Sequence, residues 1–295
     1  MKQNKKFGFI LAGLTLLAVA FVLCAGCTGD GGAQSPEQKS ISIGYVLWDS
    51  EIASTNVLKQ VFEKAGYDVT ITAVDAAPLY QAVASGDVDC TVSAWLPRTQ
   101  KAYMDEFGDS LDLVGKNLEG ARIGLVVPTY VTIDSIEEMN GVKEKFEGEI
   151  VGIDAGAGVM KTTDEAIEAY GLEYDLISSS GAGMTAALKK AVGREEWIVV
   201  TGWTPHWKFA RWDLKYLEDP KGVYGGDEYI GTLARTGLAQ DDPEAYAILK
   251  RFHWTPDDMA SVMLDIEDGT SHEDAAKKWI DAHPDQVNAW LGSKA

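Results

Sequence analysis

Two stretches of the chain share one pattern and decide the fold: PLYQAVASGDVDCTVSAWLP (Pro78–Pro97) and MTAALKKAVGREEWIVVTGWTP (Met184–Pro205). Each begins with an amphipathic, helix-like segment, passes through a short polar turn, and continues into an apolar run typical of a buried strand. Each ends in Trp-x-Pro. A third apolar run, ISIGYVLW (41–48), also ends in a tryptophan. The duplication predicts two similar α/β lobes.

The rest of the chain alternates strand-like and helix-like segments. Apolar spacing and turn residues predict strands at 41–48, 68–74, 89–95, 122–128, 149–156, 173–180 and 197–203. The same signals predict helices at 55–66, 78–86, 132–141, 161–171, 184–192, 242–252, 256–269 and 272–283. Strands that alternate with helices indicate the α/β class, with a largely parallel sheet covered on both faces.

The duplication also predicts the domain limits. We expect residues 40–128 and 231–295 to form lobe 1 and residues 129–230 to form lobe 2, so that the chain crosses a hinge between them twice. Ligands of open α/β sheets bind beyond the carboxyl ends of the strands. Trp48, Trp95 and Trp203 are all expected at such ends. Two facing lobes would therefore bring the three rings to one cleft.

The first residues have the layout of a secretory signal. Lys2, Lys5 and Lys6 precede an uncharged apolar run at 7–23, and Ala25-Gly26-Cys27 resembles a lipoprotein cleavage box. Residues 1–26 are therefore predicted to be a signal peptide. Cys27 is predicted to carry the lipid that anchors the protein to the outer face of the cell membrane. An uncleaved anchor and ordinary cleavage without a lipid remain alternatives.

The segment at 27–39 is rich in Gly, Ser and Pro and predicts a flexible tether. Cys90 is the only cysteine after it, so no intramolecular disulfide is expected in the folded part. The net charge of −19 makes nucleic acid and anionic lipid surfaces unlikely partners.

Catalysis is not indicated by the sequence. The four histidines have no metal-ligand spacing, and no carboxylate pair stands out as an acid–base pair. No cofactor motif is complete. Asp49 and Glu51, which follow Trp48 closely, are interpreted as helix-start residues near the positive end of a helix dipole.

Three tryptophans at equivalent strand ends restrict the chemistry of the expected cleft. Indole rings pack in cores, stack on sugars, or contact cations through their π faces. A quaternary ammonium group has no N–H to donate, and its methyl groups are bulky and slightly positive. An aromatic cage matches such a group, and each desolvated cation–π contact is worth about 2 kcal/mol.

A second feature suits an anion. EIVGIDAGAGVMKTTDEAIEAYG (149–171) is predicted to be a strand, a glycine-rich turn and a helix, so the backbone N–H groups of Gly158 and Val159 would be free to hold an anion. The phosphate-binding P-loop is excluded, because Met160 stands where that motif needs glycine before Lys161. The alternative is a tight packing turn. Cage and anion site together fit a zwitterion with a quaternary ammonium and a carboxylate, such as glycine betaine.

Five stretches, YVLWDSEIAST, SAWLPRTQKAY, GLVVPTYV, GIDAGAGVMKTTDEAI and TGWTPHWKFA, resemble the glycine betaine-binding protein of OpuA-type ABC importers. The resemblance covers nearly all of the chain after the tether. It implies the type II periplasmic-binding-protein fold, which closes on its ligand between two lobes. It implies that Trp48, Trp95 and Trp203 surround the ammonium group and that Gly158 and Val159 hold the carboxylate. An ABC permease with its ATPase is the implied partner.

The chain departs from the family at one implied ligand contact. Relatives have a histidine on the carboxylate where this chain has Gln100 in WLPRTQ. An amide donates a hydrogen bond but gains no charge, so we expect a weaker and less pH-dependent contact, with Arg98 as a candidate substitute. His206 is a candidate for a supporting role near the cleft. Choline, carnitine and proline betaine remain alternative ligands, and a glycan-acting surface enzyme is a more distant alternative.

Overall fold

The computed structural model describes residues 38–292. The predicted signal peptide, Cys27 and the tether up to residue 37 lie outside the described residues, as do residues 293–295. Between residues 38 and 292, no helix has the length and apolar character needed to cross a membrane.

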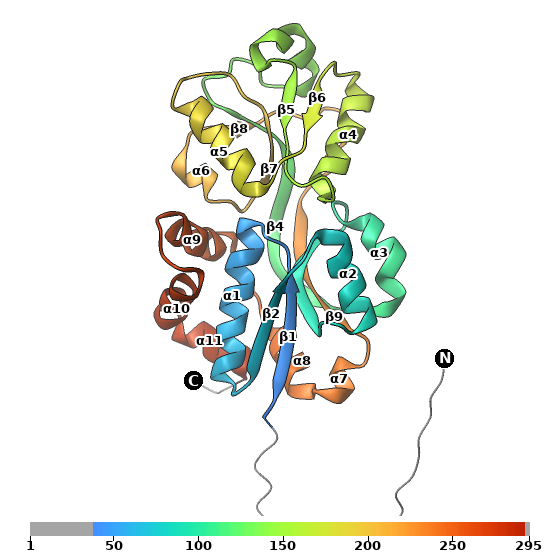
Figure 1. Cartoon of the computed structure of the whole chain (residues 1–295), viewed down its shortest axis with the longest axis vertical. Coiled ribbons are helices and arrows are strands. Elements are labelled where there is room, and N and C mark those ends of the chain that lie inside the picture. The colour runs from blue at the N-terminus through green and yellow to red at the C-terminus, as the bar shows by residue number, and fades with distance from the viewer. Residues whose placement is uncertain (1–37, 293–295) are drawn as a thin grey trace, which may run out of the picture. The chain divides into compact units, whose positions relative to one another are not determined.

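The lobe that contains both ends of the described chain is built on three parallel strands and their helices (Figure 1). The strands are β1 (Ser40–Tyr45), β2 (Asp68–Ala73) and β3 (Cys90–Leu96). The helices are α1 (Asp49–Lys64), α2 (Ala76–Ser85) and α3 (Lys101–Phe107), the last followed by a 3-10 turn, η1 (Gly108–Ser110). Every residue of β3 is buried, because helices cover the sheet around it.

One long strand, β4 (Leu111–Pro128), runs through both lobes. Its first part, up to Ala121, pairs with β9 (Glu228–Arg235), which returns from the other lobe and also pairs with β3. From Arg122 onward β4 pairs with β7 and β8 of the second lobe. The pairing thus changes partner inside β4, between Ala121 and Arg122, and the strand continues without a break.

The second lobe is smaller and repeats the arrangement. Its strands are β5 (Glu149–Val151), β6 (Asp175–Ile177), β7 (Val200–Thr204) and β8 (Leu214–Tyr216). Its helices are η2 (Ile136–Phe146, of the 3-10 type), α4 (Gly158–Tyr170), α5 (Gly181–Val192) and α6 (Lys208–Arg211). Strand β5 is parallel to β6 and to β7.

The sheet is mixed rather than largely parallel, which corrects the prediction. Strands β1–β3 and β5–β7 form parallel groups, but β4 and β9 make antiparallel pairs with their neighbours. The physical reason is connectivity: one strand leaves the first lobe and the other comes back beside it, so the two must run in opposite directions.

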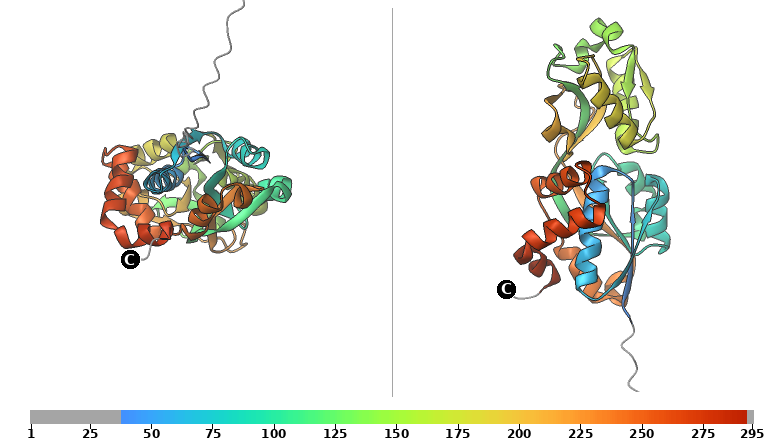
Figure 2. Two further views of the ribbon diagram at one scale, coloured as in Figure 1. Left: turned by 90° about the horizontal axis from the view of Figure 1, so that it is seen from below. Right: turned by 60° about the vertical axis from the view of Figure 1, so that its left-hand side comes forward.

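The last five helices cover the first lobe. They are α7 (Leu238–Asp241), α8 (Pro243–Arg251), α9 (Pro256–Glu267), α10 (His272–Ala282) and α11 (Pro284–Leu291). Figure 2 shows α9, α10 and α11 beside α1, against which they pack. Trp279 stacks on Trp290 with ring centroids 5.5 Å apart, and both rings are buried. These helices fix α1, whose first turn lies next to the site.

Candidate ligand-binding site

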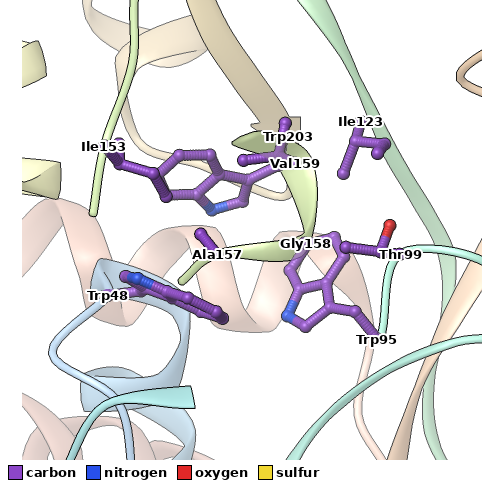
Figure 3. Close-up of a pocket in the computed structure, with 9 residues that line it drawn as sticks. All are labelled: Trp48, Trp95, Thr99, Ile123, Ile153, Ala157, Gly158, Val159 and Trp203. Atoms are coloured by element: carbon purple, nitrogen blue, oxygen red, sulfur yellow. The ribbon is translucent and has the colours of Figure 1, made fainter. Parts of the chain in front are cut away.

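Three indole rings from the two lobes line one small cavity (Figure 3). Trp48 and Trp95 belong to the first lobe and Trp203 to the second. The cavity is small and its lining is apolar. A small site of this kind suits a ligand of few atoms. We call these three residues the aromatic cage.

Each ring of the aromatic cage is positioned by the end of a strand. Trp48 follows β1 and is the N-cap residue of α1. Trp95 lies in the last residues of β3, and Trp203 occupies the equivalent place in β7. Side chains alternate between the faces of a strand, so the residue two positions earlier would point the same way. The ends of β3 and β7 therefore place Trp95 and Trp203, and the start of α1 places Trp48.

The other lining residues come from both lobes and were missed at the sequence level. No charge or unusual spacing distinguishes these mostly small or aliphatic side chains. They are Thr99, Ile123, Ile153 and Ala157.

Carboxylates accept the indole N–H groups of two cage rings. Nε1 of Trp48 donates to Oδ2 of Asp154 at 2.8 Å, and Nε1 of Trp95 donates to Oε1 of Glu51 at 2.7 Å. Within residues 38–292, Nε1 of Trp203 has no hydrogen-bond partner. Trp48 and Trp95 are therefore each held at the indole nitrogen by a carboxylate.

The first turn of α4 supplies backbone donors at the cavity. Gly158 and Val159 line it, and N–H groups in the first turn of a helix have no carbonyl partner within the helix. The next N–H group, that of Met160, already donates to the carbonyl of Ala157 at 3.0 Å. Two donors thus remain for an anion at the positive end of the helix dipole.

The lobes touch directly around the cavity. The hydrogen bond from Trp48 to Asp154 joins them, and Oη of Tyr103 donates to the carbonyl of Gly156 at 2.6 Å. Arg211 and Asp268 form an ion pair farther out. Gly158 lies so close to the first lobe that a Cβ atom there would be 2.0 Å from the carbonyl oxygen of Thr99. The two lobes are therefore in a closed arrangement.

Gln100 does not line the cavity. Its side chain is buried behind Trp95, where Oε1 accepts the backbone N–H of Trp95 at 2.7 Å and the hydroxyl of Tyr80 at 2.8 Å. Among the described residues Nε2 has no partner. The predicted contact of Gln100 with the ligand carboxylate thus stays a prediction, while its visible contacts hold the backbone of a cage residue in place.

Thr99 and Arg98 precede Gln100 and are held by one carboxylate. Both backbone N–H groups donate to Oε1 of Glu228, at 2.8 Å and 2.7 Å respectively, and the hydroxyl of Thr99 bonds Oε2. Glu228 begins β9, the strand that returns from the second lobe. These contacts tie the Trp95 segment to the crossing strands, and the side chain of Arg98 is not among the cavity-lining groups.

His206 lies behind Trp203 and is neutral. Its Nδ1 accepts the backbone N–H of Lys208 at 3.1 Å, so its proton is on Nε2, which lies 3.2 Å from Oδ2 of Asp49. Burial, and then the charge of Lys208, lower the pKa of His206 to about 4. The residue supports Trp203, with ring centroids 4.7 Å apart, and contacts the first turn of α1.

Lys208 is a fully buried amine stacked on a cage ring. Its Nζ lies 4.2 Å from the ring centroid of Trp203 and has no hydrogen-bond partner in the described part of the chain. Burial lowers the pKa of Lys208 from 10.5 to about 7, an effect that Asp49 opposes. An amine without a partner in an apolar site destabilises the fold.

We expect Lys208→Met to stabilise the protein by about 2 kcal/mol at pH 7, because it removes the desolvated amine but keeps the packing. The folded pKa of Lys208 is below the unfolded value, so the wild type loses stability as pH falls from 10.5 toward 7. The free energy of unfolding, measured with urea, should be lower at pH 7 than at pH 9.5 in the wild type. The variant should not show this difference. Lys250→Met, at an exposed position, is the control. A destabilised Lys208→Met protein would contradict the assignment.

Within the described chain, no group of three or more His, Cys, Asp or Glu side chains could hold a metal ion. The arrangement offers three π faces, two backbone donors and an apolar lining, with no acid–base pair aimed at the cavity. Such a site can bind a small cation that also carries an anionic group.

Comparison with known proteins gives the site its context. The family model described as the substrate binding domain of ABC-type glycine betaine transport systems matches residues 39–282. The crystal structure of lactococcal OpuAC, in its closed-liganded conformation with glycine betaine, is 46% identical, with a TM-score of 0.83. The match covers 86% of this chain and 99% of that chain.

Two further relatives agree. The glycine betaine/L-proline-binding protein ProX of Borrelia burgdorferi is 42% identical over 85% of this chain and 96% of its own, with a TM-score of 0.83. The glycine betaine/carnitine transport binding protein GbuC of Listeria monocytogenes is 49% identical over 162 residues. That match is 54% of this chain and 54% of GbuC, so it spans about half the length of this curated relative.

These similarities confirm the predicted resemblance and the predicted two-lobed α/β fold class. The family match extends over both lobes and over every residue that lines the cavity. The chain belongs to the OpuAC family, the substrate-binding domains of ABC-type glycine betaine transport systems.

Proposed function

We propose that this protein captures glycine betaine with the aromatic cage and the first turn of α4. The observation that carries the proposal is that three indole rings and the first two residues of α4 line the same small cavity. The trimethylammonium group would lie among Trp48, Trp95 and Trp203, and the carboxylate would accept the N–H groups of Gly158 and Val159. Gln100 would contact the ligand carboxylate only through Nε2, because its Oε1 already accepts hydrogen bonds from Tyr80 and Trp95.

The two halves of the ligand would be bound by parts of different lobes. Trp48 and Trp95 belong to the first lobe, whereas Trp203 and the start of α4 belong to the second. An open protein would offer an incomplete cage, so ligand binding and lobe closure are coupled. The lobes would comprise residues 40–128 with 231–295 and residues 129–230, and the chain would cross between them along β4 and β9.

The cellular setting is part of the same proposal. The bound solute would be delivered to an ABC permease that is driven by its ATPase, and the protein itself would perform no catalysis. Residues 1–26 would direct export, and a lipid on Cys27 would hold the protein at the extracytoplasmic face of the membrane. Mass analysis of the mature N-terminus tests the anchor: an acylated cysteine at position 27 supports it, and an unmodified N-terminus contradicts it.

Calorimetric titration of the purified mature protein with glycine betaine tests the ligand. We expect saturable one-site binding accompanied by a change in tryptophan fluorescence. Choline has the same cation without the carboxylate, so it should bind at least about tenfold more weakly if the backbone donors are used. Carnitine and proline betaine complete the series. Tighter binding of choline than of glycine betaine would overturn the carboxylate assignment, and no binding by any of the four would overturn the function.

A further inference from the structure

Glu51 is a buried carboxylate that no cation neutralises within the described residues. Its side chain is fully buried in the first turn of α1. Oε1 accepts Nε1–H of Trp95 at 2.7 Å, and Oε2 accepts the hydroxyl of Ser50. Burial raises the pKa of Glu51 to about 7. The negative charge of Asp49 repels that of Glu51 and raises the pKa further. The carboxylate thus occupies a site that disfavours its charge.

A neutral acceptor would orient Trp95 equally well. The carbonyl of a glutamine has the same length and reach, and it would accept the indole N–H without the free energy needed to bury a charge. Orientation of the ring therefore explains the hydrogen bond but not the carboxylate. What a carboxylate adds is negative charge one indole ring away from the cavity.

We propose that Glu51 is a positioning residue whose negative charge acts through Trp95 to favour a cationic ligand group over a neutral group of the same shape. This inference rests on the proposed function, because it concerns the ammonium end of the same ligand. The ring of Trp95 lies between the carboxylate and the cavity, with its nitrogen bonded to Glu51 and its face lining the site. A carboxylate on the N–H edge makes the face of the ring more negative, which strengthens a cation–π contact.

The charges around the three rings are unequal in a way that supports this assignment. Asp154 accepts Nε1–H of Trp48 just as Glu51 accepts that of Trp95. Trp203 has no carboxylate at its nitrogen and instead has the amine of Lys208 against its ring. The two carboxylates thus lie next to the cage rings of the first lobe, Trp48 and Trp95. Glu51 is the more deeply buried of the two carboxylates.

The test compares two ligands that differ only in charge. Glycine betaine and 3,3-dimethylbutanoate have the same carboxylate, but the second has a tert-butyl group in place of trimethylammonium. Both are titrated by calorimetry at pH 8 into wild-type protein and into the Glu51→Gln, Glu51→Asp and Glu63→Gln variants. Glu63 is the matched control, because it is an exposed glutamate on the same helix. The neutral ligand is measured by competition where it binds weakly.

We expect Glu51→Gln to lower the affinity for glycine betaine about tenfold, because a negative charge one indole ring away from the ammonium group attracts it appreciably even at an effective dielectric constant of about 20. The affinity for 3,3-dimethylbutanoate should change less than about twofold, so the preference for the cation falls. Glu51→Asp keeps the charge and should keep most of that preference, and Glu63→Gln should change neither affinity.

The outcomes separate the charge from the hydrogen bond. If Glu51→Gln binds glycine betaine as the wild type does, or weakens both ligands equally, the proposal is overturned and Glu51 only holds the ring. Loss of the cation preference in Glu51→Asp, which retains the charge, would also overturn it. Failure of wild-type protein to bind glycine betaine is a different result: it would contradict the proposed function rather than the role of Glu51.

Discussion

Gly158→Ala is expected to lower the affinity for glycine betaine roughly a hundredfold while leaving the unliganded protein as stable as the wild type. A Cβ atom at this position would lie 2.0 Å from the carbonyl oxygen of Thr99 and 2.7 Å from its carbonyl carbon. Both atoms belong to the backbone, so no side-chain rotation relieves the clash. Overpacking costs about 3 kcal/mol, and here this cost destabilises only the closed form of the protein.

The open form of Gly158→Ala has no such contact, because Thr99 belongs to the other lobe. Its melting temperature without ligand should therefore be that of the wild type. Gly156→Ala is the matched control two residues earlier in the same turn, where a Cβ atom would meet only Oη of Tyr103 at 4.0 Å. Small-angle X-ray scattering should show that glycine betaine compacts the wild type and Gly156→Ala but not Gly158→Ala. Normal affinity in Gly158→Ala would mean that the closed arrangement is not the one that binds.

Alanine at any residue of the aromatic cage is expected to weaken glycine betaine binding by more than tenfold. Each desolvated cation–π contact is worth about 2 kcal/mol, which corresponds to roughly thirtyfold in the binding constant. The losses should be larger for Trp48 and Trp95 than for Trp203, because carboxylates accept the N–H groups of the first two rings and the amine of Lys208 lies against the third.

Phenylalanine at the same positions retains a π face and should recover part of the affinity. Trp197→Phe is the control, because this ring lies under the amine of Lys145, 4.1 Å away, and does not line the cavity. Calorimetry gives the affinities, and thermal unfolding shows whether a variant has lost structure. Near-wild-type affinity in all three alanine variants would contradict the assignment of the cage.

The positions of Trp95 and Trp203 at the ends of strands could be predicted from the sequence because they follow from local rules, and Trp48 was predicted from the apolar run that precedes it. A buried strand followed by Trp-x-Pro fixes where the strand ends and which way its last side chain points, and the pattern occurs twice. The turn before α4 was predictable for the same reason, since a strand, a glycine-rich turn and a helix leave unbonded N–H groups wherever they occur in that order.

The long-range part of the site could not be predicted. Asp49 and Glu51 were interpreted as helix-start residues, and both do lie in the first turn of α1. The pattern gives no sign that Glu51 is buried against β3 or that Asp154 reaches Trp48 from the other lobe. Such contacts depend on how distant elements pack, which local spacing does not encode.

The first half of β4 and the whole of β9 were missed for a related reason, whereas the second half of β4 was predicted as the strand at 122–128. The first half of β4 contains LDLVGKNLEG, which alternates poorly and includes two glycines. The sequence after Gly226 gave no separate strand signal, although β9 begins at Glu228. Both strands are held mainly by each other and by β3, so their pairing is decided by the tertiary structure.

A crystal structure of the mature protein with glycine betaine measures the geometry of the aromatic cage most directly. We predict that the ammonium nitrogen lies within about 6 Å of the ring centroids of Trp48, Trp95 and Trp203. We also predict a carboxylate oxygen about 3 Å from the backbone nitrogens of Gly158 and Val159. A ligand bound outside the cavity, or one whose ammonium group contacts carboxylates while the three rings pack on protein, would contradict both assignments.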